Sequence, residues 1–391
     1  MTCDDPAVSF EGDGVTAVEG LQEKFVEFAR LGAGKIPLYH RLATGAAEDP
    51  EVAGRLLLAH PNQQMPVLMF AAVHDVLLAG HEGPLRQWYA SVVAHPKRVG
   101  TGSDDPWPHF QRLVTEDEDV AERLRTRSTQ TNEVGRCAVL LPAIAEIASL
   151  APGSPPGGRR PVGLIELGCS AGLNLLFDRY GYRYTATVGG TQGTIAGLGT
   201  DAPLVLESES RGALRPPVPE AYPHIASRVG VDLHPVDLHD RVQSRWLVAC
   251  QWPDQPERIH RARAAIALAH ADPPRTVEGD MVDEVAHLVR SVPGHALPVV
   301  FATWALAYLP ADRQAALLAA LDEVAAEREL SMVLAEHPDE IPGIPIPPRP
   351  DGALKPHPTA LARIDWWNGT RVATRLADVH PHGTWIEWLQ P

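Results

Sequence analysis

The first 150 residues show the hydrophobic pattern of helices. Apolar residues recur in steps of three and four within 25–29 and 67–71, which is the spacing of an amphipathic helix. Proline and glycine interrupt these runs, and strand-like alternation of apolar and polar residues is scarce. The pattern therefore predicts an all-α domain. Its expected helices cover 20–32, 52–59, 66–79, 84–94, 105–113, 117–130 and 132–150.

A stretch rich in proline, glycine, serine and arginine at 151–160 breaks this periodicity and is the best candidate for a linker. It separates an expected helical domain, residues 1–150, from a second domain, residues 151–391. In the second domain short apolar runs alternate with helical segments, which predicts an α/β fold with a parallel, doubly wound sheet. The expected strands cover 162–167, 230–233, 275–278, 299–303 and 331–335, and the expected helices cover 171–180, 241–249, 256–271, 282–292 and 311–328.

Three segments of the second domain depart from the alternating pattern. The runs 361–366 and 385–389 flank Asn368-Gly369 and a further turn, which predicts antiparallel strands at the end of the chain. Residues 182–222 are rich in glycine, threonine and proline, and we expect an insertion there with a hairpin around 203–210. The proline-dense stretch 341–358 predicts a long loop near the carboxyl end of the sheet.

Composition and charge narrow the class of protein. Hydrophobic residues make up 45% and charged residues 21%, so a folded globular chain is expected. The formal charge of −15 repels phosphate backbones and makes a nucleic-acid partner unlikely. No apolar run is long enough to cross a membrane, and residues 1–14 lack the basic and apolar regions of a signal peptide, so we expect a cytoplasmic protein. The four cysteines form no CxxC pair, which favours reduced thiols over a disulfide framework or a zinc site.

The most informative segment covers 162–174. An apolar strand runs into a turn that reads Glu166-x-Gly168-x-Ser170-x-Gly172 and continues toward Asn174. Glycines let a backbone pass close to a ligand, and a following helix would present unpaired N–H groups, so a nucleotide-like ligand is expected at this turn. The spacing differs from the dinucleotide fingerprint G-x-G-x-x-G, which disfavours pyrophosphate binding and a nicotinamide-dependent oxidoreductase.

This segment resembles the first motif of class I S-adenosylmethionine-dependent methyltransferases. The resemblance implies that Glu166 lies near the amino group of the cofactor's methionine portion. It also implies that Gly168, Ser170 and Gly172 form the floor of the pocket, with Asn174 close by. The implied fold is a Rossmann-like sheet of seven strands in the order 3-2-1-4-5-7-6, with antiparallel carboxyl-terminal strands. The all-α domain would precede this sheet.

Later segments extend the resemblance. The stretch 228–235 is similar to the end of the second strand of these enzymes, which implies that Asp232, or else Asp237, binds the ribose hydroxyls. The stretch 277–281 is similar to the end of the third strand, which implies that Asp280 meets the adenine amino group while Met281 packs on the ring. The stretch 298–310 resembles the fourth strand and the loop that borders the methyl group, with Thr303 at the strand end.

A closer resemblance is to an uncharacterised bacterial branch of this superfamily that has a helical amino-terminal domain. The similar segments are 129–136, 170–175, 252–254 and 382–383. Within the first of them, Gln130, Asn132 and Arg136 either face the cofactor or cap and pair within the helical domain. The resemblance implies no particular substrate.

The expected function is methyl transfer from S-adenosylmethionine to a small-molecule acceptor, with the helical domain as a lid on the substrate side. A bound sulfonium already carries an activated methyl group, so the protein mainly aligns the acceptor and excludes water.

Where a base is needed, the candidates are Tyr308, Glu336, His337 and, as first choice, His382, because they follow expected strand ends or lie on the closing hairpin. No metal site is expected, because the histidines repeat no recognised ligand spacing. The alternative function is a binding or scaffold protein that keeps a cofactor pocket without catalysis.

Overall fold

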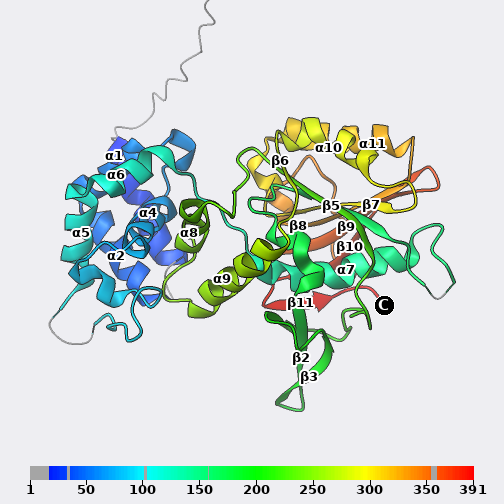
Figure 1. Ribbon diagram of the computed structural model, residues 1–391, viewed down its shortest axis with the longest axis horizontal. Coiled ribbons are helices and arrows are strands. Elements are labelled where there is room, and N and C mark those ends of the chain that lie inside the picture. Colours follow the sequence, from blue (N-terminus) through cyan, green and yellow to red (C-terminus); the bar gives the residue numbers. More distant parts are fainter. Residues whose placement is uncertain (1–16, 33–35, 101–103, 157, 354–358) are drawn as a thin grey trace, which may run out of the picture. The chain divides into compact units, whose positions relative to one another are not determined.

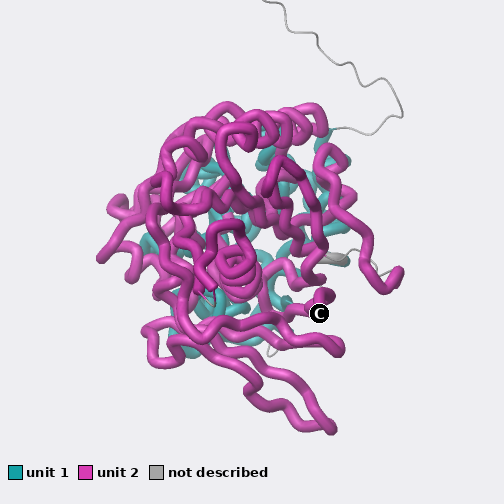
Figure 2. The backbone as a smooth tube through the Cα atoms, turned by 90° about the vertical axis from the view of Figure 1, so that its right-hand side faces the viewer, with its two compact units in different colours: residues 1–130, 248–259 teal, residues 131–247, 260–391 magenta. Residues whose placement is uncertain are grey.

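A computed structural model describes residues 17–32, 36–100, 104–156, 158–353 and 359–391. Within these ranges no helix has both the length and the apolar character needed to cross a bilayer. The chain forms two compact units (Figure 2). Unit 1 comprises residues 1–130 and 248–259, and unit 2 comprises residues 131–247 and 260–391.

Unit 1 is built from helices, as its hydrophobic pattern predicts. Proline starts many of them, at the position where a missing N–H is not needed. The α-helices are α1 (Ala17–Glu27), α2 (Pro37–Glu48), α3 (Pro50–Gly54), α4 (Pro66–Leu78), α5 (Pro106–Glu116) and α6 (Glu118–Thr126). Shorter turns are the π-helical η1 (Phe28–Gly32) and the 3₁₀ turns η2 (Arg55–Leu58), η3 (Pro61–Gln63) and η4 (Pro84–Trp88). The apolar pattern did not predict α2, and the helix expected over 84–94 is only the short η4.

The segment 248–259 belongs to unit 1 because it packs into the aromatic core of that unit. The ring centroid of Trp252 lies 5.4 Å from that of Phe28 and 5.7 Å from that of Tyr39. Two residues further on, Asp254 accepts a hydrogen bond from the backbone N–H of Leu38 at 3.0 Å, in the first turn of α2. The Trp-Pro-Asp segment therefore has a structural role that joins distant parts of the chain.

Unit 2 contains the sheet. Its strands are β1 (Val162–Leu167), β2 (Gly181–Val188), β3 (Thr191–Leu198), β4 (Val205–Ser210), β5 (Ile225–Asp232), β6 (Thr276–Glu278), β7 (Leu297–Thr303), β8 (Leu330–Glu336), β9 (Thr359–Trp367), β10 (Thr370–Val379) and β11 (Trp385–Trp388). Its α-helices are α7 (Cys137–Leu150), α10 (Met281–Ser291) and α11 (Ala311–Ala325), while α8 (Arg241–Ala249) and α9 (Pro256–Ala271) each begin or end in unit 1. Its 3₁₀ turns are η5 (Val134–Arg136), η6 (Leu173–Arg179), η7 (Leu306–Tyr308) and η8 (Pro338–Glu340).

The sheet is mixed and has eleven strands, in the order β3-β2-β4-β11-β10-β9-β8-β7-β1-β5-β6. Its parallel part, β6-β5-β1-β7-β8, corresponds to the expected order 3-2-1-4-5. The expected total of seven strands is wrong, and so is the ending 5-7-6, because β9 and β10 follow β8 as direct neighbours. The two-residue turn Asn368-Gly369, with φ of 52° and 71°, explains this ending, since it pairs β9 and β10 as a hairpin.

The insertion before β5 accounts for three of the additional strands. β2 and β3 form a hairpin around Gly189-Gly190, whose φ values of 59° and 82° suit a tight turn. β4 pairs in parallel with β2 on one side and with β11 on the other. The hairpin expected around 203–210 is therefore wrong, because this segment forms a single strand between partners that are distant in sequence.

The compact units divide the chain differently from the expected boundary at residue 150. Helix α7 belongs to unit 2, where it contacts β4 and β8. The hydroxyl of Tyr184 in β2 donates to the carbonyl of Ala138 in α7 at 2.7 Å. The glycine-rich stretch after α7 is fastened as well, since Arg160 forms an ion pair with Glu329 at 3.0 Å. The composition of 151–160 marked a break in the helical periodicity. The boundary between the compact units lies earlier, before Thr131, because α7 packs on the sheet.

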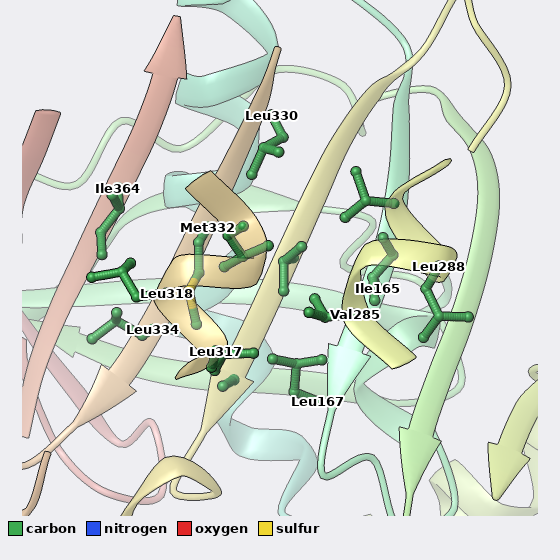
Figure 3. Close-up of a cluster of buried hydrophobic side chains, with 14 of the residues drawn as sticks. Ile165, Leu167, Val285, Leu288, Leu317, Leu318, Leu330, Met332, Leu334 and Ile364 are labelled. Atoms are coloured by element: carbon green, nitrogen blue, oxygen red, sulfur yellow. The ribbon is translucent and has the colours of Figure 1, made fainter. Parts of the chain in front are cut away.

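Helices cover both faces of the parallel strands (Figure 1). α10 and α11 lie side by side on one face, and α7 lies on the other. Figure 3 shows the core on the first face, where Ile165 and Leu167 of β1 meet Leu288 of α10 and Leu317 of α11. Side chains alternate along a strand, so Glu166 lies on the opposite face, the one that α7 covers. All six residues of β1 are buried.

Candidate functional site

The carboxyl ends of the parallel strands meet along one edge of the sheet in unit 2. Leu167, the last residue of β1, pairs with Val231 of β5 on one side and with Ala302 of β7 on the other. β5 and β7, which both come later in the chain, thus lie on opposite sides of β1. Open α/β sheets bind ligands at such a switch point, outside the carboxyl ends of the strands. The glycine-bearing turn after β1 lies there.

This turn is tight and depends on glycine. Gly168, Ser170 and Gly172 have φ of 68°, 52° and 70°, in the left-handed region. The N–H groups of Gly168 and Cys169 both donate to the carbonyl of Val231, at 2.9 and 3.1 Å. A Cβ atom on Gly168 would lie 2.6 Å from the Cβ of Ala305, closer than real Cβ atoms come. Only glycine fits at this position.

The expected α-helix over 171–180 is wrong. The segment forms the 3₁₀ turn η6, with a kink at Leu176. The N–H of Leu173 donates to the side-chain oxygen of Asn132 at 3.0 Å, and that of Leu175 donates to the carbonyl of Gly172 at 3.1 Å. These N–H groups are therefore used within the protein.

Glu166 is buried at 2% exposure directly before the turn. One carboxylate oxygen, Oε1, accepts a hydrogen bond from the side-chain amide of Asn174 at 3.0 Å. The other oxygen, Oε2, has no hydrogen-bond partner among the residues that the structure describes. Burial raises the pKa of Glu166 to about 8, although the hydrogen bond from Asn174 acts in the opposite direction. One strong acceptor thus remains unused beside the turn.

Asp232 and Asp237 have different surroundings. Asp232 is the last residue of β5, and its two carboxylate oxygens accept hydrogen bonds from the N–H groups of Ser170 at 2.8 Å and His234 at 2.9 Å. Asp237 is exposed and accepts a hydrogen bond from the N–H of His239 at 2.8 Å. The fold therefore brings Asp232 to the turn, while Asp237 is used within its own loop.

Asp280 and Met281 follow β6. The carboxylate of Asp280 accepts from the N–H of Val282 at 2.8 Å, which caps α10, and forms an ion pair with Arg313 at 2.8 Å. Partial burial opposes ionisation, but these contacts hold the pKa of Asp280 below its usual range. The methyl carbon of half-buried Met281 would lie 3.7 Å from a Cβ on Gly168. Met281 is thus a direct neighbour of the turn.

Asn132 and Arg136 belong to unit 2, so their pairing is not within the helical unit. Both are buried. Asn132 holds the N–H of Leu173, and Arg136 donates to the carbonyl of Thr303 at 2.8 Å and to the carbonyl of Pro381 at 3.0 Å. They connect the start of α7 with the motif turn, the end of β7 and the β10–β11 turn. Gln130 is the last residue of the first stretch of unit 1, outside the unit that holds these strand ends.

Two glycines allow the β10–β11 turn to approach η5. A Cβ atom on Gly383 would lie 1.9 Å from the carbonyl oxygen of Gly135, and one on Gly135 would lie 2.4 Å from the carbonyl oxygen of His382. The close approach brings His382 Nδ1 to 3.9 Å from Oε2 of Glu133. The other carboxylate oxygen of Glu133, Oε1, lies 3.5 Å from the guanidinium of Arg261. Glu133 was not predicted as a site residue. The feature that could have identified it is its position within 129–136, one of the segments that carry the closer family resemblance.

The four candidate bases have unequal surroundings. Tyr308 is 86% exposed. His337 is buried, and its Nδ1 accepts from the N–H of Asp339 at 3.3 Å, which caps η8. His382 has a side chain that is 33% exposed, near Glu133.

Glu336 is the fourth candidate and is fully buried at the end of β8. Its Oε1 accepts from the N–H groups of Ala305 at 2.9 Å and Leu306 at 3.2 Å. Within the described part of the chain, its Oε2 has no hydrogen-bond partner. Burial raises the pKa of Glu336 to about 7. This carboxyl group therefore fastens the loop after β7 and has one unused oxygen.

Trp304, which follows β7, was missed by sequence reasoning. It has a φ of 53°, in the left-handed region where a bulky residue is rare. Its indole N–H is buried, and no described residue accepts a hydrogen bond from it. An aromatic residue after an apolar strand is typical of a hydrophobic core, so the sequence pattern could not distinguish Trp304 from an ordinary core residue.

The described residues include no group of three or more histidine, cysteine or carboxylate side chains that could hold a metal ion. Burial raises the pKa of the Cys137, Cys169 and Cys250 thiols, to about 12 for Cys250, which does not favour a thiolate nucleophile. All three are free, and Cys3 lies outside the described residues.

One family model matches residues 22–388, nearly the whole chain. Its description is "Uncharacterized protein conserved in bacteria (DUF2332)". The chain therefore belongs to this family. A comparison with curated proteins finds no match.

Proposed function

We propose that this member of the DUF2332 family binds S-adenosylmethionine at the carboxyl ends of β1, β5 and β6 and transfers its methyl group to a small-molecule acceptor. The observation that carries the proposal is the unpartnered, buried Oε2 of Glu166 beside a turn that only Gly168 can form. The negative charge of the chain favours a small acceptor over a nucleic acid.

The residues present fit the methionine portion of this cofactor. An ammonium group carries three N–H donors, and a charge-assisted hydrogen bond to Glu166 would satisfy the oxygen that the protein leaves unpartnered. The absent side chain at Gly168 leaves the backbone open to a close approach. In this proposal a ligand ammonium stabilises the ionised form of Glu166, which burial disfavours.

The ends of the neighbouring strands would hold the rest of the cofactor. A carboxylate has about four lone-pair directions, and Asp232 uses two of them on backbone N–H groups, so the others can accept from ribose hydroxyls. Asp280 and Met281 would face the adenine edge and ring, since both follow the next parallel strand. In this interpretation the five parallel strands are the Rossmann-like part of a methyltransferase sheet, and the remaining strands are additions.

When bound, the cofactor supplies a methyl group already activated by its sulfonium. The task of this chain is to hold that group in line with the acceptor atom and to exclude water. Arg136 fixes the carbonyl of Thr303, so the end of β7 keeps its place beside the motif turn. Glu336 can accept a proton at Oε2, and His382 can accept one with Glu133 nearby. Tyr308 and His337 have weaker cases because one is exposed and the other caps η8.

Calorimetry with S-adenosylhomocysteine and S-adenosylmethionine tests the proposal. We expect wild-type protein to bind both, and we expect Glu166→Gln to bind at least about tenfold more weakly because a charged hydrogen bond is lost. Glu340→Gln, which changes an exposed carboxylate, serves as the matched control. A wild-type protein that binds neither compound would refute the proposal. Binding without methyl transfer to any acceptor tried would favour a binding or scaffold protein instead.

A further inference from the structure

Two unpartnered polar atoms of opposite kind lie at the ends of β7 and β8. Trp304 has a buried indole N–H without an acceptor, and Glu336 has a buried carboxylate oxygen without a donor. They follow Thr303 and Ala335, the last ladder pair of the two strands. Neither atom bonds the other. A buried polar group without a partner is unfavourable, so each is a place where a ligand can supply what the protein lacks.

The backbone fixes these two residues side by side. The N–H of Trp304 donates to the carbonyl of Ala335 at 3.1 Å, and the next two N–H groups, of Ala305 and Leu306, donate to Oε1 of Glu336. Adjacent parallel strands lie about 4.8 Å apart, so the two side chains start from neighbouring positions. Oε1 holds the loop, and Oε2 is left for another partner.

The backbone at Trp304 is strained. A φ of 53° is unfavourable for a bulky residue and persists only where the surroundings impose it. Such strain is concentrated at ligand sites and active sites. Here it coincides with a donor and an acceptor that both lack partners, which is a second and independent sign of a ligand position.

We propose that Trp304 and Glu336 form the subsite for the methyl acceptor and that it selects an uncharged group with an N–H or O–H beside a carbonyl-type oxygen, as in a carboxamide or a lactam. Oε2 of Glu336 accepts the N–H or O–H, and the indole of Trp304 donates to the oxygen. The identification of this ligand as a methyl acceptor rests on the proposed function.

The chemistry of the pair excludes two other acceptor classes. A carboxylate would place a second negative charge against Glu336 and offer it no proton, and an ammonium would offer no acceptor to the indole of Trp304.

Glu336 also has a role in the transfer step. As the acceptor nitrogen or oxygen forms its bond to the methyl carbon, the sulfur–carbon bond breaks with its electrons kept by sulfur, and the acceptor's proton passes to Oε2 of Glu336.

The test uses the full chain labelled with ¹⁵N and follows its indole N–H resonances by NMR. The probes are benzamide, which has both an N–H and a carbonyl, acetophenone, which has only the carbonyl, and benzoate, which is charged. The Trp304 resonance is assigned with Trp304→Phe. The indoles of Trp366 and Trp367, which donate to Asp322 and Ser331, are internal controls.

We expect benzamide to shift the Trp304 resonance, with benzoate and acetophenone at least about tenfold less effective. Glu336→Gln keeps a side-chain oxygen for the loop but presents an amide donor, so its preference for benzamide over acetophenone should disappear. Glu220→Gln, which changes an exposed carboxylate elsewhere in the chain, should behave as wild type. The subsite is refuted if benzamide leaves the Trp304 resonance unmoved, or if all three probes shift it equally.

Calorimetry with S-adenosylhomocysteine on the same samples separates this inference from the proposed function. Binding of S-adenosylhomocysteine without any effect of benzamide would overturn the acceptor subsite and leave the cofactor proposal standing. A preference for benzamide over acetophenone that Glu336→Gln abolishes, in a protein that does not bind S-adenosylhomocysteine, would support the subsite as a ligand position and overturn its identification with methyl transfer.

Discussion

At Glu166, burial and an unpartnered oxygen both act against the charged form of the carboxyl group. Its pKa is raised from 4.5 to about 8, so the folded protein holds a proton there at pH values where the unfolded chain has lost it. The resulting contribution to stability is present below about pH 4.5 and is lost as the pH rises toward 8. Glu336 acts in the same direction, with a pKa of about 7.

Glu166→Gln should remove this pH dependence. We expect the free energy of unfolding of ligand-free wild type to fall between pH 5 and 8 relative to that of the variant, because only the wild type must ionise Glu166, whereas Glu336 titrates in both proteins. Urea unfolding of both proteins at several pH values measures the difference. Glu340→Gln should follow the wild-type curve. Parallel curves for wild type and Glu166→Gln would show that Glu166 is not the group that titrates.

The two candidate ribose carboxylates give a second prediction at the residue scale. Asp232→Asn should reduce the free energy of unfolding by about 1–3 kcal/mol, because the amide cannot accept from the N–H groups of both Ser170 and His234. It should also weaken S-adenosylhomocysteine binding. Asp237→Asn should change both quantities much less, since Asp237 is exposed. Chemical denaturation and calorimetry check the ranking, which is refuted if Asp237→Asn has the larger effect on binding.

Gly168→Val tests the turn itself. A branched side chain at a φ of 68°, with Ala305 only 2.6 Å from the new Cβ, should lower stability by about 2 kcal/mol or more and prevent cofactor binding. Gly294→Ala is the control, because nothing lies within 4 Å of its Cβ position. Thermal unfolding and calorimetry give the result. A folded Gly168→Val protein with wild-type affinity for S-adenosylhomocysteine would put the proposed pocket in the wrong place.

At the scale of elements, a buried ion network fastens the loop after η8 to the sheet. Arg349 in this loop pairs with Asp378 of β10 and with Asp351, and Arg375 also pairs with Asp378, at 2.7 Å. Asp378 is fully buried, and the side chain of Arg349 is 5% exposed. Removing one partner of a buried pair leaves the other charge unpaired, which costs far more than breaking a surface pair.

Asp378→Asn should therefore destabilise the protein by about 3–5 kcal/mol, because it removes the buried carboxylate that Arg349 and Arg375 share. Glu327→Gln, which breaks the exposed pair with Arg290, is the matched control and should leave stability almost unchanged. Urea unfolding at neutral pH measures both. Equal effects of the two substitutions would mean that the network contributes no more than a surface pair.

At the scale of the whole molecule, unit 1 is built from two stretches that are far apart in the sequence. Within residues 248–259, Trp252 packs into the aromatic core of unit 1, and Asp254 accepts a hydrogen bond from the first turn of α2. A chain that lacks residues 1–130 would keep this segment without the partners that bury it. Its exposed apolar surface would then favour aggregation.

A truncated chain that starts at Thr131 should be poorly soluble. The same truncation with 248–259 replaced by a glycine–serine linker of equal length should be more soluble, because the orphaned aromatic segment is gone. Soluble yield and light scattering compare the two. Equal solubility would show that 248–259 does not depend on unit 1 for its burial.

The sequence by itself determined the features that depend on neighbouring residues. Periodicity predicted α8 and α9 with the observed bounds, and the apolar run before Gly168 predicted β1 and its turn. Asn368-Gly369 predicted a turn between antiparallel strands at the end of the chain, because two residues that tolerate a left-handed φ form such a turn locally, although no strand was expected over 370–379, where β10 lies. The order of Glu166, Asp232 and Asp280 along the chain also anticipated their positions at successive strand ends.

Only the tertiary structure decided the features that depend on distant partners. Pairing of β4 with β2 and β11 created an eleven-stranded sheet, and the packing of α7 on β4 and β8 assigned that helix to unit 2. The unpartnered atoms of Trp304 and Glu336 follow from the same cause. A buried polar atom has a hydrogen-bond partner only if the fold brings one within about 3 Å of it. The spacing of residues along the chain does not reveal which groups the fold brings together.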